Sequence, residues 1–185
     1  MSKETIRRTI LGKRNVMSVH EIREKSKAIS QALFKREEFL KAKTVCVYIG
    51  FGSEVRTDEI IEQCALLGKK VVVPAMTNEL GDLEPAEFLG FDKLKKTFFG
   101  IQEPFPAKKI PIEEIDLVVA PGVAFDTQKN RVGFGKGYYD RFLARLAHNV
   151  PIIALAFELQ IVESIEPTPN DIKMTRIITE KRLIS

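Results

Sequence analysis

Three short runs of apolar residues, at 71–73 (VVV), 117–120 (LVVA) and 152–157 (IIALAF), contain no polar residue in alternation. A strand with one solvated face alternates apolar and polar residues, whereas a continuously apolar strand is covered on both faces. Strands of this kind are typical of parallel sheets between layers of helices. The sequence therefore predicts an α/β fold, with an open, mostly parallel sheet and helices on both faces, in a single domain over residues 1–185.

Helix signals lie before and between these strands. Ser2 can cap a first helix, and Ser18 with Glu21 three residues later is a capping-box pattern that opens a second. Residues 44–74, with Thr57 as a helix cap, predict one strand–helix–strand unit with a right-handed crossover. The other expected elements are a strand near 87–91, a short helix near 92–96, a strand at 117–120, a helix at 138–147 and strands at 151–157 and 176–179.

Composition narrows the class of protein. With 44% hydrophobic and 29% charged residues, the chain has the balance of a soluble globular protein. The two cysteines, Cys46 and Cys64, lie in apolar surroundings without paired spacing, which argues against a disulfide scaffold. No apolar run approaches the roughly 20 residues of a membrane-spanning helix, and residues 1–13 alternate charges instead of forming a signal peptide. We expect a cytoplasmic monomer without membrane association.

Positive charge is concentrated at the start of the chain. Residues 1–43 contain 12 Lys and Arg residues against 5 Asp and Glu residues, and the remainder is slightly acidic. A basic segment of this kind suits a nucleic acid, an anionic small molecule or simply a solvated helix face. Charge alone does not decide among these three.

Glycine is concentrated in one segment between a predicted strand and a predicted helix. Four of the 11 glycines fall within residues 122–137, in the stretch PGVAFDTQKNRVGFGKGYYD. Glycines let backbone N–H groups turn toward an anion, Arg131 and Lys136 add positive charge, and a helix from Tyr138 presents its positive end. The spacing matches neither the Walker A loop nor GxGxxG. The segment favours a phosphate-binding loop over a surface turn that happens to contain glycine.

The residues that follow this loop allow more than one interpretation. Tyr138 and Tyr139 are of a type more often found in the core than in a site. Asp140 suits either the N-terminus of a helix or a metal, and Asp171, which follows Pro169, suits a turn. With only two histidines in the chain, histidine catalysis has little support.

Taken together, the motifs are similar to those of one enzyme family. The stretch PGVAFDTQKNRVGFGKGYYDRFL, with KETIRR at the start, GSEVRTDEII after the first strand, FGIQEP in the middle and PNDIKMTRIIT near the end, resembles the 5-formyltetrahydrofolate cyclo-ligases. The resemblance runs in order from about residue 3 to residue 179. It implies a sheet of the sugar-phosphate isomerase and CoA-transferase type. It also implies conversion of 5-formyltetrahydrofolate and ATP to 5,10-methenyltetrahydrofolate, ADP and phosphate, with Mg²⁺ as cofactor.

For the nucleotide, the resemblance implies a basic pair and the Gly-rich loop. Lys3 and Arg7 match the ATP-contacting pair of the family, and their spacing of four residues puts them on one helical face. Lys136 matches the phosphate-facing cation, and we expect it to be catalytic. The ATP-binding residues implied in the loop are Arg131, Val132, Gly133, Phe134, Gly135, Lys136, Gly137, Tyr138 and Tyr139.

For the folate and the metal, the resemblance implies four further residues. Ile49 matches an apolar substrate contact, and Glu54 matches a carboxylate that accepts N–H bonds from the pterin. Asp140 and Asp171 match the Mg²⁺ carboxylates, which phosphate oxygens and waters would complete. Two positions after Glu54, where the family often has an acidic residue, this chain has Arg56. The loop residues implied near the formyl group are Gly135, Lys136, Gly137, Tyr138 and Tyr139.

Two other functions are compatible with parts of the sequence. A phosphosugar isomerase on a similar sheet would need an acid–base carboxylate or lysine at the strand ends, and would not explain Asp140 together with Asp171. A nucleic-acid-binding module would use residues 1–43 to follow phosphates, with binding that weakens steeply in salt. That segment lacks the interleaved aromatic residues of a single-strand binder. We therefore expect small-molecule partners and no nucleic acid.

Overall fold

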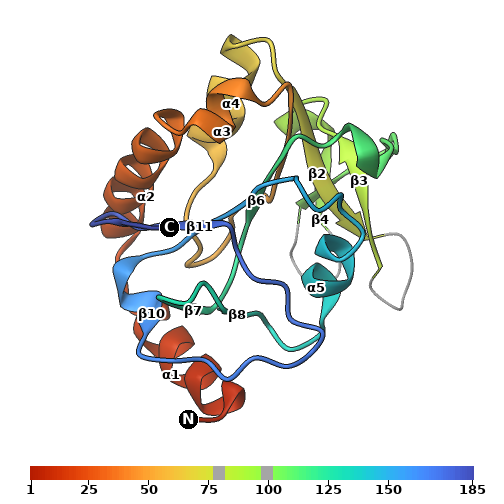
Figure 1. The fold of residues 1–185 in the computed structure, drawn as a ribbon. Helices are drawn as coiled ribbons and strands as arrows, with labels where there is room; N and C mark the ends of the chain where they lie inside the picture. The colour runs from red at the N-terminus through yellow and green to blue at the C-terminus, as the bar shows by residue number, and fades with distance from the viewer. Residues whose placement is uncertain (77–81, 97–101) are drawn as a thin grey trace.

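A seven-stranded sheet forms the centre of the computed structural model, which describes residues 1–76, 82–96 and 102–185 (Figure 1). Its order is β12-β11-β9-β6-β1-β2-β3. The strands are β1 Thr44–Val47, β2 Lys70–Met76, β3 Leu83–Glu87, β6 Leu117–Ala120, β9 Ile152–Leu155, β11 Arg176–Ile178 and β12 Leu183–Ile184. The five inner strands pair in parallel, and β3 and β12 are antiparallel edges. The predicted mostly parallel sheet is confirmed.

Helices cover both faces of this sheet, as the continuous apolar strands predict. Because successive side chains of a strand point to opposite faces, β1 contributes to two hydrophobic clusters. Val45 and Val47 pack with residues of α2 (Val19–Phe34), α3 (Glu37–Lys41) and α4 (Asp58–Leu66). Cys46 packs on the other face with Phe142 of α5 (Tyr138–Leu143). None of the helices in the described residues has the length and apolarity needed to cross a membrane.

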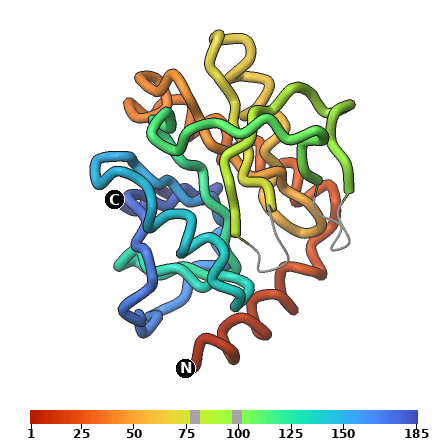
Figure 2. The backbone as a smooth tube through the Cα atoms, turned by 90° about the vertical axis from the view of Figure 1, so that its right-hand side faces the viewer, coloured from red at the N-terminus to blue at the C-terminus, as the bar shows by residue number. Residues whose placement is uncertain are grey.

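The first helix, α1 (Lys3–Asn15), packs on a second, smaller sheet. This sheet has the order β10-β7-β8, with strands Ile161–Val162, Ala124–Asp126 and Arg131–Val132, and the sequence analysis did not anticipate it. Ile6 and Ile10 of α1 are buried against Val132 of β8. Figures 1 and 2 show α1 at the base of the molecule, beside β7 and β8. The packing brings the basic face of α1 to the Gly-rich loop, which follows β8.

The N-terminal caps agree with the sequence, with one exception. Ser2 Oγ accepts the Thr5 N–H at 3.2 Å, and Ser18 Oγ accepts the Glu21 N–H at 3.1 Å. Thr57 precedes α4 but makes no capping bond. Its hydroxyl donates to the Tyr48 carbonyl at 2.7 Å and accepts the Gly50 N–H at 3.1 Å, so it fastens the turn after β1 instead.

Several boundaries differ from the prediction. β2 continues through Pro74 to Met76, because β3 pairs with it and Pro74 lies opposite Pro85, where neither residue has an N–H to donate. The expected helix at 92–96 is a 3₁₀ turn, η1 (Phe91–Lys93), followed by β4 (Leu94–Lys96), which pairs with β5 (Gln102–Pro104). Two further 3₁₀ turns are η2 (Ile112–Glu114) and η3 (Glu158–Gln160). α5 ends at Leu143, short of the predicted residue 147.

Candidate active site

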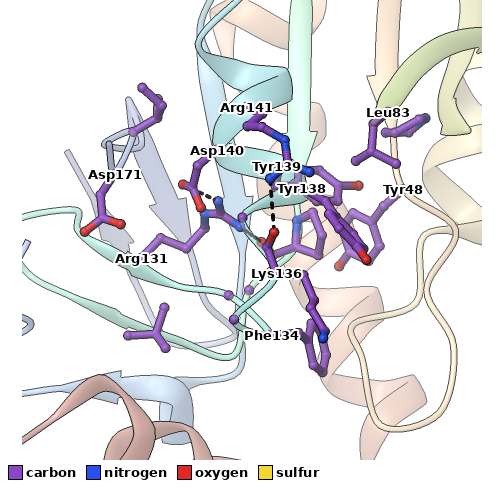
Figure 3. A pocket seen from close by; sticks show the side chains of 18 of the residues that line it. Tyr48, Leu83, Arg131, Phe134, Lys136, Tyr138, Tyr139, Asp140, Arg141 and Asp171 are labelled. Carbon is purple, nitrogen blue, oxygen red and sulfur yellow. Dashed lines mark hydrogen bonds and ion pairs between the residues drawn. The ribbon is translucent and has the colours of Figure 1, made fainter. Parts of the chain in front are cut away.

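A cavity of about 960 Å³ opens at the carboxyl ends of β1, β2 and β6. Ligands of open parallel sheets bind at this edge. The residues that line it belong to α1, to the loop that follows β1, to strand β2, to the Gly-rich loop and to residues 168–172. All fifteen residues predicted for ATP, folate and magnesium line this one cavity. In the view of Figure 3, Asp171, Asp140 and Arg131 lie on one side and Tyr48 and Leu83 on the other.

The Gly-rich loop crosses from β8 to α5 with two left-handed turns. Gly135 has a φ of +95°, and Gly137, which precedes α5, has a φ of +67°. A Cβ atom on Gly135 would lie 3.2 Å from Nη2 of Arg7, so a side chain there would crowd the end of the Arg7 side chain as well as strain the backbone. Because α5 is only six residues long, its dipole adds less positive potential than the longer predicted helix. Side-chain cations and loop amides therefore dominate the field here.

Arg131 and Asp140 form a partly buried ion pair across the start of α5. Nη2 of Arg131 donates to Oδ1 of Asp140 at 2.7 Å, and Nη1 donates to the Pro121 carbonyl at 3.4 Å. The side chain of Arg131 is 4% exposed and that of Asp140 is 24% exposed. The guanidinium also lies 5.6 Å from the ring centroid of Tyr139. Arg131 is therefore held in place by Asp140 before any ligand binds.

The basic pair of α1 is also engaged. Nζ of Lys3 donates to Oδ2 of Asp171, an ion pair between residues 168 positions apart. Burial alone would raise the pKa of Asp171, but the hydrogen bonds from Lys3 and from the Thr168 N–H hold it below its usual value. Nε of Arg7 donates to the Gly133 carbonyl at 2.9 Å. These two contacts join α1 to the Gly-rich loop and to the segment around Asp171.

Lys136 differs from these cations. It is exposed between Gly135 and Gly137, and its ammonium makes no ion pair with any residue that the structure describes. Its carbonyl accepts a bond from Nη1 of Arg141 at 3.1 Å, which secures the backbone (Figure 3). The loop thus presents one uncommitted positive charge to the cavity.

Glu54 lies at the other end of the cavity, in the loop after β1. It is 6% exposed, and its Oε2 atom accepts the Phe51 N–H at 3.3 Å. Burial raises the pKa of Glu54, while the positive charges of Arg14 and Arg56 and the Phe51 bond oppose that rise. A buried carboxylate that lines a cavity has the character of a ligand-binding group rather than of a surface acid.

Comparison with known proteins identifies the chain. The model of the 5-formyltetrahydrofolate cyclo-ligase family matches residues 1–180. The chain belongs to this family. It is 31% identical to a probable 5-formyltetrahydrofolate cyclo-ligase of Caenorhabditis elegans, over 96% of this chain and 90% of the relative. It is 30% identical to the 5-formyltetrahydrofolate cyclo-ligase of Mycolicibacterium smegmatis, over 77% of this chain and 76% of the relative.

Solved structures agree with the assignment. The NMR structure of the Aquifex aeolicus 5,10-methenyltetrahydrofolate synthetase superimposes with a TM-score of 0.86 at 31% identity, over 99% of this chain and 92% of that one. The Mycoplasma pneumoniae 5,10-methenyltetrahydrofolate synthetase gives a TM-score of 0.79 at 25% identity, over 97% and 99% of the two chains. The predicted family, fold class and enzyme class are confirmed, and the cyclo-ligase hypothesis prevails over the phosphosugar isomerase.

Sequence reasoning missed several residues of the cyclo-ligase cavity. Glu103 of β5 lines it and accepts the Met76 N–H at 3.1 Å, and burial raises the pKa of this carboxyl. Glu103 belongs to the motif FGIQEP of the family resemblance, of which Phe99 and Gly100 lie outside the described residues. Tyr48, one residue before Ile49, also lines the cavity, and its hydroxyl donates to the Val55 carbonyl at 3.2 Å.

Proposed function

We propose that this cyclo-ligase converts 5-formyltetrahydrofolate and ATP to 5,10-methenyltetrahydrofolate, ADP and phosphate, with Mg²⁺ as cofactor. The observation that carries the proposal is a single cavity with two chemically different ends. One end has a Gly-rich loop with Lys3, Arg7, Arg131 and Lys136, which suits a triphosphate. The other end has the buried Glu54 among apolar and aromatic side chains, which suits a flat ring with N–H donors.

At the nucleotide end, the protein positions phosphates and supplies positive charge. Phosphoryl transfer needs little more than this, because charge on the phosphoryl oxygens is the main feature to stabilise. Lys136 contacts the transferred phosphoryl group, since its ammonium forms no ion pair with the residues that the structure describes and its backbone is secured. Arg131 and Lys3 lie at the same end in fixed positions.

The reaction itself requires no protein nucleophile. The formyl oxygen attacks the γ-phosphorus of ATP, ADP departs with the electrons of the broken P–O bond, and an imidate phosphate remains. N10 of the same folate then attacks the activated carbon, N10 loses its proton, and phosphate leaves with the C–O bond electrons. Both steps depend on holding the reacting atoms in line in one cavity.

At the folate end, Glu54 accepts N–H bonds from the aminopyrimidinone edge of the pterin. The carboxylate is removed from water and receives one backbone N–H bond from Phe51, so it retains capacity for further donors. Ile49, 9% exposed, and the ring of Tyr139 line the same cavity and present apolar surface to the ring system.

Asp140 and Asp171 fit a magnesium ion by the chemistry of their donors. Both are carboxylates, which Mg²⁺ prefers, and both line the cavity at the end that holds the Gly-rich loop. Within the described residues no group of three or more potential metal ligands gathers. Phosphate oxygens and waters would complete the shell around the two carboxylates. When bound, the ion neutralises charge on the phosphates.

We also propose that the enzyme is a cytoplasmic monomer that acts on small molecules.

An omission assay tests the proposal. Purified protein is mixed with 5-formyltetrahydrofolate, ATP and Mg²⁺, and absorbance is followed in the methenyl-folate band, beside reactions that lack each component. We expect a rise only when all are present, with ADP formed in equal amount. Folded protein that binds ATP but gives no rise would refute the folate assignment, and a rise without ATP would refute the phosphorylation step.

A further inference from the structure

Arg14 is a buried cation that none of the sequence motifs contains. It lies in the last turn of α1, the helix that carries Lys3 and Arg7, and is 4% exposed. A buried guanidinium needs hydrogen-bond acceptors and a nearby negative charge to offset its lost hydration. The hydrogen-bond acceptors of the Arg14 guanidinium therefore identify the segments that Arg14 joins.

Three separate segments meet at the Arg14 guanidinium. Nε donates to Oγ of Ser53 at 3.0 Å, in the loop that carries Glu54. Nη1 donates to the Gly122 carbonyl at 3.3 Å, in the turn after β6. The guanidinium carbon lies 5.8 Å from the ring centroid of Phe134, in the Gly-rich loop. Arg14 thus connects the folate end of the cavity to the nucleotide end.

Arg56 fastens the same loop from its other end. Its Nη1 donates to the Gly50 carbonyl at 3.0 Å, and its Nη2 donates to the Gly52 carbonyl at 2.8 Å. The backbone N–H of Arg56 donates to Oγ of Ser26 on α2 at 2.9 Å. Glu54 therefore lies in a loop that two arginines secure by side-chain bonds.

The same two arginines provide the positive charges that Glu54 experiences. Burial raises the pKa of this carboxyl, and the guanidinium groups of Arg14 and Arg56 and the Phe51 N–H oppose that rise because they favour its ionised form. The hydroxyls of Tyr48 and Tyr139 also face it, and the Glu54 charge helps to raise the pKa of both, after burial as the main cause. Since burial keeps both tyrosines neutral, the arginines are the charged groups that oppose the rise that burial causes in the pKa of Glu54.

We propose that Arg14, supported by Arg56, is a positioning residue of this enzyme: it fixes the Glu54 loop against the Gly-rich loop and places positive charge near Glu54, where the folate binds. The inference rests on the proposed function of Glu54 as the pterin-binding carboxylate. Arg14 does not line the cavity, and its Nε and Nη1 atoms donate to Ser53 and Gly122 instead. Its effect on the reaction passes through Glu54.

The test compares Arg14→Met, which removes the charge, with Arg14→Lys, which keeps it. Arg8→Met is the matched control, because Arg8 is an exposed arginine on the same helix. KM for 5-formyltetrahydrofolate, KM for ATP and the pH dependence of equilibrium folate binding are measured, with unfolding temperatures. For Arg14→Met we expect folate KM about tenfold higher and ATP KM within about twofold of wild type, since one charge-assisted contact is weakened.

The pH dependence separates an electrostatic role from a structural one. Loss of the Arg14 charge raises the pKa of Glu54 further, so folate binding in Arg14→Met should fail at a higher pH than in wild type and recover as pH rises. Arg14→Lys should keep the wild-type pH dependence. A defect in Arg14→Met that is equal at every pH, or unchanged binding, would overturn the proposal.

Two features keep the result decisive. If Arg14→Met does not fold, Arg56→Met removes the second positive charge near Glu54, from a half-buried residue. An unchanged pH dependence of folate binding in Arg56→Met would then refute the proposal. The wild-type omission assay distinguishes the two levels of inference. If the wild-type enzyme shows no turnover, the proposed function is refuted. If the wild-type enzyme turns over and the variants bind folate as well as it does, only the role of Arg14 is refuted.

Discussion

The two ends of the cavity hold their carboxylates in opposite ways. At the nucleotide end, Asp140 and Asp171 are partly exposed, and each forms an ion pair with a cation from another element. At the folate end, Glu54 is 6% exposed, and no cation of the described chain lies within ion-pair distance of it. Arg14 and Arg56 act on Glu54 through space.

The difference indicates what kind of ligand each end accepts. Partly exposed ion pairs contribute little net stability, so they can exchange partners when a ligand brings its own charge. A buried carboxylate without an ion pair has lost its hydration and is stabilised when a ligand donates N–H bonds to it. It therefore favours a neutral ligand that carries N–H donors. A triphosphate with its cation matches the first case and a pterin matches the second.

The largest expected effect is at the nucleotide end. Lys136→Ala should lower kcat by about 100-fold to 1,000-fold, because it removes the charge that faces the transferred phosphoryl group. The unfolding temperature should stay near wild type, since Lys136 is exposed. Lys13→Ala removes an exposed lysine outside the cavity and is the control. Steady-state rates in the absorbance assay measure both variants. Unchanged kcat in folded Lys136→Ala would remove this lysine from the site.

At the folate end, Glu54→Gln should raise KM for 5-formyltetrahydrofolate by about thirtyfold, the effect of losing a charged acceptor for N–H donors. KM for ATP should stay within about twofold, because the two ends hold different ligands. Initial rates at varied folate and varied ATP give both constants. An equal rise in the two constants would contradict the division of the cavity into two ends.

The ion pair of Asp140 allows a test through the metal. Asp140→Asn should raise the half-saturating Mg²⁺ concentration by about tenfold, since an amide is a weaker ligand than a carboxylate. A magnesium titration of turnover measures the shift. Asp92→Asn, which neutralises an exposed carboxylate on η1, is the control and should behave as wild type. An unaltered titration would leave Asp140 with only its structural role beside Arg131.

A smaller effect is expected from the more exposed ion pair. Lys3→Gln should raise KM for ATP by about threefold, within the range for partly solvated charges. The difference from wild type should shrink as salt concentration increases, because ions screen exposed charges. ATP titrations at low and high salt provide the measurement. A difference independent of salt would show that Lys3 acts in a desolvated contact.

The smallest effect concerns stability. Because burial raises the pKa of Glu54, the folded state binds this proton more tightly than the unfolded state. Stability therefore falls as pH rises from the ordinary Glu pKa through the raised value, and the loss persists above it. Glu54→Gln should unfold at a higher temperature than wild type at about pH 8, by about 2–4 °C for each kcal/mol of burial penalty that the substitution removes in a chain of this size. The gain should disappear near about pH 4. A lower unfolding temperature at pH 8 would contradict the burial penalty.

Local sequence patterns predicted the centre of the fold. The caps at Ser2 and Ser18 are formed as expected, and the continuous apolar runs became the inner parallel strands β2, β6 and β9. The caps depend on residues near one another in the chain. Burial of both faces of a strand requires a continuous run of apolar residues, which is visible in the sequence. The residues that the family resemblance implied for the site also line one cavity, which α1, the loop after β1, the Gly-rich loop and residues 168–172 form together.

Long-range packing decided what the sequence left open. The small sheet under α1 is completed where β10 pairs with β7, and Ile161 there lies opposite Phe125 from a separate part of the chain, which local propensity does not encode.

By itself the sequence determined the parallel sheet, the capped helices and the Gly-rich loop, since each follows from spacing and residue type over a few positions. Only the tertiary structure decided that Lys3 pairs with Asp171, that Arg14 is buried against Ser53, and that Glu54 is buried without an ion pair to any residue in ranges 1–76, 82–96 and 102–185. Such contacts join residues tens of positions apart, so they depend on where the fold brings the side chains together.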